Sequence, residues 1–205
     1  MQLRFATGLT SEEYVKQEGW RLATLEKCPL HPQGGCGFAR HTAYSRVEPA
    51  GTQIARYYCR KGHVTFSLIP DCLASRFSST LEEIETVVDA VEGRTQSVEK
   101  VAEKLRPDIE HQGAMRWIYR RVRAVTAILV AVIGLRPDVF AGRQPSLNDV
   151  RSVLGVERVL PVLREIASRH LASLPPPLGF GPPVARRCLV THRHQQKTGA
   201  DPPEN

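Results

Sequence analysis

Two short clusters of thiol and imidazole side chains are the residues of this sequence best suited to chemistry. The first cluster, CPLHPQGGCG, holds Cys28, His31 and Cys36, and the second, CRKGH, holds Cys59 and His63. Cysteine thiolates and neutral imidazoles are ligands that tetrahedral Zn²⁺ prefers, and a closed set of four is typical of a structural site. The sequence therefore predicts a zinc site whose ligands are Cys28, Cys36, Cys59 and His63.

His31 is the alternative to Cys36 in the first cluster. Cys28 and His31 have the tighter spacing, but Cys28 is followed by proline and Cys36 by glycine, as ligands often are in the turns of zinc ribbons. We prefer Cys36 and place His31 in an inserted loop, although His31 could replace it. The other interpretation, buried cysteines without a metal, fits two paired clusters less well.

The segment between the clusters reads as two strands around a Pro-Ala-Gly turn, and HVTFSLI after the second cluster reads as a third strand. These features predict a zinc ribbon over residues 28–70. Residues 1–27 form a lead-in to it, with a short helix starting at Ser11 and a strand over 20–27.

Beyond residue 70 the hydrophobic period changes to that of helices. Thr80 with Glu83 is a capping-box pattern, Ser97 is a second cap, and Pro137 marks a helix end. The sequence thus predicts an all-α domain over 71–174, followed by a Pro- and Gly-rich disordered tail over 175–205. The expected helices cover 81–92, 97–105, 114–134, 146–154 and 157–173. The predicted fold class is α+β and mostly α.

A stripe of arginines marks the third expected helix. Arg116, Arg120 and Arg123 fall on one face at helical spacing, Arg121 flanks them, and no acid interrupts the segment. A basic face on an ordinary bundle is the simpler interpretation, but stacked arginines repel one another unless an anion lies beside them. Three helices ending in an arginine-rich one also predict a helix-turn-helix at about 81–123, with these four arginines contacting DNA.

Composition agrees with a binding function. The net charge is +7, which favours a polyanionic partner, and an odd number of five cysteines disfavours a disulfide framework. Cys72 and Cys188 are expected not to be ligands.

The apolar run at 124–135 is too short to span a bilayer and no signal peptide is evident, so we expect a cytosolic protein with no membrane partner. No convergent catalytic constellation is present, which favours a non-enzyme.

The ribbon and the residues after it resemble a family of uncharacterised bacterial proteins associated with insertion elements. The resemblance rests on CPLHPQGGCGFARHTAY, IARYYCRKGHVTFSLIPDCLASR and LEEIETVV, and it extends from about Cys28 to Leu174. It implies a transposase-like ribbon and helix-turn-helix, a zinc- and DNA-binding role, and a transposase or another protein as a possible partner. It implies Cys28, Cys36, Cys59 and His63 as ligands.

The sequence thus predicts a zinc-stabilised, non-catalytic DNA-binding protein, an accessory or remnant of a mobile element. The rival from another class is a protein-interaction adaptor, in which the arginines face an acidic protein. A third interpretation is RNA binding through stacking on Tyr44, Tyr57 and Tyr58, which cross-strand packing of these tyrosines opposes.

Overall fold

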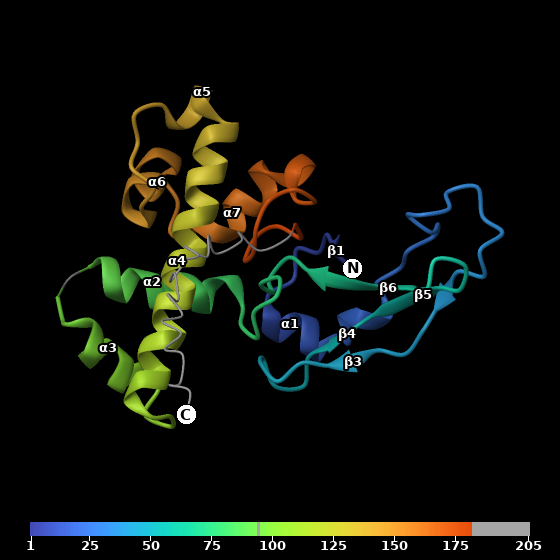
Figure 1. The fold of residues 1–205 in the computed structure, drawn as a ribbon, viewed down its shortest axis with the longest axis horizontal. Helices are drawn as coiled ribbons and strands as arrows, with labels where there is room; N and C mark the ends of the chain where they lie inside the picture. Colours follow the sequence, from blue (N-terminus) through green and yellow to red (C-terminus); the bar gives the residue numbers. More distant parts are fainter. Residues whose placement is uncertain (94, 182–205) are drawn as a thin grey trace, which may run out of the picture.

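A small sheet and a group of helices lie side by side in the molecule and together make an α+β fold (Figure 1). The structure is a computed structural model, and it describes residues 1–93 and 95–181. The prediction of an α+β fold is confirmed, whereas the finer assignment to a zinc ribbon stays a prediction.

The main sheet has the strand order β1-β6-β5-β2. Its centre is the antiparallel pair β5 (Arg56–Cys59) and β6 (Val64–Pro70), which the second cysteine cluster joins as a tight turn. Strand β2 (Ala39–Arg40) pairs with β5. Strand β1 (Gln2–Phe5) runs parallel to β6 at the other edge, so part of the expected lead-in belongs to the sheet.

The predicted Pro-Ala-Gly hairpin is present as a separate pair, β3 (Tyr44–Ser45) with β4 (Gln53–Ile54). Helix α1 (Ser11–Lys16) begins at Ser11 as predicted, with Thr10 as its N-cap. The strand expected over 20–27 is wrong. The chain there forms the 3₁₀ turn η1 (Gly19–Arg21), and the carbonyls of Trp20, Arg21 and Ala23 accept hydrogen bonds from the Arg40 side chain instead of from a neighbouring strand.

Local signals placed the first helices after the sheet accurately. Helix α2 (Leu81–Glu92) has the complete capping box of Thr80 and Glu83, and α3 (Val98–Leu105) is capped by Ser97. Helix α4 (His111–Leu135) is the longest and contacts both of them. Its C-terminal half packs into the main helical core, whereas its N-terminal half packs with α2 and α3 in a second cluster.

The remaining helices agree with the sequence to different degrees: the helix predicted over 146–154 is present, the one predicted over 157–173 is shorter, and a short helix after Arg136 was not predicted. They are α5 (Pro137–Phe140), α6 (Leu147–Leu154), α7 (Val159–Ile166) and the 3₁₀ turn η2 (Ser168–His170). Buried Glu85 on α2 fixes α7, because its carboxylate accepts hydrogen bonds from the backbone N–H groups of Val159 and Leu160 at 2.8–2.9 Å. The single helix expected over 157–173 is instead the shorter helix α7 followed by the turn η2.

One buried arginine joins the sheet to the helices. Arg164 on α7 is 1% exposed, and its guanidinium donates to the carbonyls of Asp71 and Leu73 at 2.9 and 2.7 Å and of Pro177 at 2.8 Å. On the surface nearby, Arg4 of β1 pairs with Asp71 and with Glu165 of α7. The junction is thus built from arginines and carbonyl or carboxylate oxygens.

The C-terminal segment begins inside the fold. Leu178 is fully buried in the helical core, and the Ser75 hydroxyl and backbone N–H donate to the carbonyls of Gly179 and Pro177. The tail predicted from residue 175 is therefore wrong for residues 175–181. Its remainder, 182–205, lies outside the described residues, as does Cys188.

We expect Arg164→Met to lower the free energy of unfolding by about 3 kcal/mol, because buried carbonyl oxygens lose a charged donor while the side-chain volume is nearly kept. Urea denaturation at a fixed metal concentration measures this. The control is Arg169→Met, an exposed arginine of the same region, which should change stability by less than about 0.5 kcal/mol. Equal losses in the two variants would refute the role of Arg164.

Candidate metal centre and arginine groove

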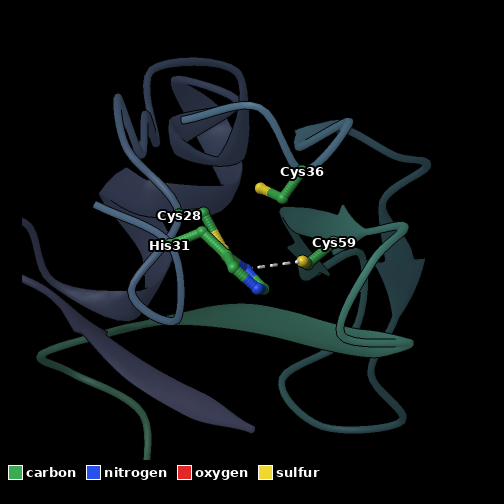
Figure 2. A group of neighbouring side chains, drawn as sticks. All are labelled: Cys28, His31, Cys36 and Cys59. Atoms are coloured by element: carbon green, nitrogen blue, oxygen red, sulfur yellow. Dashed lines mark hydrogen bonds between the residues drawn. The ribbon is translucent and has the colours of Figure 1, made fainter. Parts of the chain in front are cut away.

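Three sulfurs and one imidazole nitrogen converge beside the sheet. The side chains of Cys28, His31, Cys36 and Cys59 point toward one another, and their ligand atoms all lie within 4.8 Å of each other (Figure 2). His31 Nδ1 is 3.6 Å from Cys28 Sγ and 3.4 Å from Cys59 Sγ. Such a group of donors could hold a metal ion.

Each ligand is held by local backbone structure. Cys28 and His31 belong to one tight turn, in which the His31 N–H donates to the Cys28 carbonyl at 3.1 Å. Cys36 lies in a glycine-rich loop, where Gly37 has a positive φ of 65° and a Cβ at this position would lie 3.0 Å from Arg60 Cδ. Cys59 ends β5, and the Gly62 N–H donates to its sulfur at 3.2 Å.

The thiols of the cluster differ in the direction in which their surroundings shift the pKa. Burial acts to raise the pKa of Cys28, but hydrogen bonds from His31 and neighbouring groups outweigh it and lower the pKa to about 7. Burial and the adjacent Cys59 and Cys28 sulfurs raise the pKa of Cys36 above its usual value. Three thiolates this close repel one another, so a cation among them would favour their deprotonated forms.

The histidine of the site is His31, not the predicted His63. His63 is exposed in the β5–β6 turn with a positive φ of 49°, and its Nδ1 lies 3.3 Å from the Tyr58 hydroxyl. Successive strand residues point to opposite faces, so the Tyr58 side of the sheet is not the Cys59 side. His31 does not replace Cys36 but joins it. The sequence feature that pointed to His31 as a ligand was its position near Cys28, with two residues between them.

The other thiol and imidazole candidates lie elsewhere. Cys72 is partly buried away from the cluster, and burial raises its pKa to about 11. His41 is exposed, and its Nδ1 is 3.0 Å from the Thr42 hydroxyl.

A second candidate site is a groove along α4, called here the arginine groove. Arg116, Arg120 and Arg123 are exposed and line a cavity of about 720 Å³ together with Arg76 from the segment before α2. Its other walls are aromatic or apolar: Phe77, Tyr119, Ala124, Ala127, Pro175 and Pro176. Within residues 1–93 and 95–181, none of the four arginines has a carboxylate oxygen within 4.0 Å.

Arg121 does not share this exposure, although the sequence placed it with the DNA-contacting arginines. It is 4% exposed, donates to the Ser79 hydroxyl at 3.0 Å, and lies 3.6 Å above the centre of the Trp117 ring. Burial, and then the nearby Arg106 and Arg120 charges, lower its pKa to about 10. Arg121 therefore supports the fold. Arg76 is the groove residue that the helical pattern could not reveal.

Comparisons with protein-family models, with curated proteins and with solved structures found no match. Among the helices of the described ranges, none combines the length and the apolar character needed to cross a membrane.

We expect His31→Ala to reduce the metal bound by the purified protein well below one equivalent, whereas His63→Ala should leave it unchanged. The reason is that the His31 nitrogen lies among the three sulfurs and the His63 nitrogen faces Tyr58. Elemental analysis by mass spectrometry of freshly reduced protein measures this. Loss of metal in His63→Ala but not in His31→Ala would restore the ligand set predicted from the sequence.

Proposed function

We propose that this chain is a zinc-stabilised DNA-binding protein without catalytic activity. The observation that carries the proposal is the arginine groove, in which four cationic side chains surround one cavity and no acidic side chain is among its lining residues. Because a cavity of uncompensated guanidinium groups is unfavourable in isolation, an anion is the ligand that this arrangement best fits.

The cysteine and histidine cluster supports zinc as the stabilising metal. With Zn–S and Zn–N bonds of about 2.3 and 2.0–2.1 Å, a tetrahedral site separates sulfur from nitrogen by about 3.5 Å. His31 Nδ1 lies 3.6 Å from the Cys28 sulfur and 3.4 Å from the Cys59 sulfur, and the Cys36 sulfur lies within 4.8 Å of the other ligand atoms. Four protein donors would fill a tetrahedral shell and leave no open position for a substrate, so we assign the metal a structural role.

The metal would stabilise a part of the molecule that has little regular secondary structure. Around the cluster, β2 has only two residues and the loops carry several glycines. A metal bound to Cys28, His31, Cys36 and Cys59 would join the loop of the first cluster to the end of β5. Metal binding would thus contribute directly to the folding of a zinc ribbon.

DNA suits the groove because guanidinium groups bind phosphates by paired, charge-assisted hydrogen bonds. The exposed arginines lie on one face of α4 over more than one helical turn, so they can contact successive phosphates of one strand. α2, α3 and α4 contact one another. The helix-turn-helix and the relation to insertion elements and transposases remain predictions from the sequence.

We expect the double variant Arg116→Gln/Arg123→Gln to bind mixed-sequence DNA more weakly than the wild type and with a smaller salt dependence. The magnitude of the slope of log affinity against log salt should decrease by about 1.4–1.8, because each of the two lost phosphate contacts removes about 0.7–0.9 from it. Fluorescence anisotropy with labelled single strands and duplexes across a salt series measures both quantities.

The matched control is Arg143→Gln/Arg169→Gln, which removes the same charge from exposed positions outside the groove. Equal losses in the two double variants would mean that only the net charge matters. Polyglutamate of matching charge tests the adaptor alternative. If it competes as well as DNA does, or if no DNA binds at low salt, the DNA-binding proposal is wrong.

A further inference from the structure

The arginine groove combines positive charge with an apolar surface, and this combination limits the chemical classes of ligand that fit it. The arginines stand beside Ala124, Ala127 and the Pro175–Pro176 pair, and Phe77 and Tyr119 add two rings. A volume of about 720 Å³ is within the range of about 300–1,000 Å³ that holds compact organic ligands. A bare phosphate would leave most of this space and its apolar surface uncovered.

Tyr119 is available for stacking. It is 41% exposed and lies one residue from Arg120 on the groove face of α4. Within the described part of the chain, its ring forms no aromatic pair or cation–π contact and its hydroxyl forms no hydrogen bond to a side chain. Phe77, by contrast, already lies beneath the Arg120 guanidinium, with 5.3 Å between its ring centre and Cζ.

The segments that surround α4 also indicate whether the groove suits duplex or single-stranded DNA. A helix that reads duplex DNA must project far enough to enter the major groove. Here the segment with Arg76 and Phe77, and the segment with Pro175 and Pro176, share the cavity with the arginine face of α4. The arginines therefore line a hollow rather than an isolated ridge.

We propose that the arginine groove binds single-stranded DNA, with a base stacked on Tyr119 and the flanking phosphates on Arg76, Arg116 and Arg123. This inference rests on the proposed function and specifies its substrate class. Unpaired nucleotides present both an aromatic base and a phosphate, whereas a duplex presents phosphates and keeps its base faces stacked inside. The groove offers a partner for each group, as do other proteins that bind single strands.

The test compares a fluorescent mixed-sequence single strand, the duplex of the same sequence, and an abasic strand of the same length, all at one salt concentration. The abasic strand keeps the phosphates and lacks the bases. We expect the single strand to bind about ten-fold more tightly than the abasic strand, because one stacked base contributes about that factor. We also expect it to bind more tightly than the duplex.

Two variants of Tyr119 separate stacking from folding. Tyr119→Leu should lose about ten-fold in affinity for the single strand and little for the abasic strand, whereas Tyr119→Phe, which keeps the ring, should bind as the wild type does. Because Tyr119 is partly exposed, both should melt at the wild-type temperature, which thermal denaturation checks.

The outcomes distinguish the two proposals. If duplex and single strand bind equally, or if Tyr119→Leu binds the single strand as well as Tyr119→Phe does, the groove does not select unpaired bases and this inference is overturned while DNA binding stands. If neither form of DNA binds, both proposals fail.

Discussion

The placement of a buried cation at the junction of sheet and helices is the constraint on which the rest of this structure depends. A guanidinium away from water is costly unless its donors are matched. The two terminal nitrogens of Arg164 meet this requirement with carbonyls from the end of β6, from the segment after it, and from residue 177 near the C-terminal end of the described chain. Its Nε, also buried, has no hydrogen-bond partner among the described residues. Arg46 acts similarly at the other end of the segment before α2, donating to the carbonyls of Ala74 and Phe77. Two arginines thus hold the short stretch that carries Arg76 and Phe77 into the groove.

The sequence predicted best those elements whose signals are local. Helix α2 was placed correctly because its cap, its capping glutamate and its apolar period all fall within a few residues of one another. Strand β1 was missed, because its partner β6 lies more than sixty positions away and parallel pairing has no local signature. The C-terminal segment was missed for a related reason. Proline and glycine usually indicate an unstructured chain, but here buried partners from distant segments, among them Arg164 and Ser75, bind its carbonyls.

The functional residues show the same division between local and distant signals. The three cysteines that the sequence selected do lie together, because paired clusters at the two ends of a hairpin must approach each other. Which histidine joins them depends on the face of the sheet to which each imidazole points, and spacing alone does not encode this. Spacing likewise put Arg121 beside the exposed arginines, whereas contacts with Ser79 and Trp117 bury it. Arg76 has no periodic pattern at all and enters the groove only through the fold.

The burial of Arg121 has a thermodynamic consequence. Its charge cannot leave the interior, and it lies close enough to Arg106 and Arg120 for each to lower its pKa. The native state therefore contains repulsion between these positive charges. In the unfolded chain the charges are farther apart and the repulsion is weaker. A polyanion along α4 would screen that repulsion only while the helices remain assembled. Occupancy and folding would then be linked, so that the ligand raises the melting temperature.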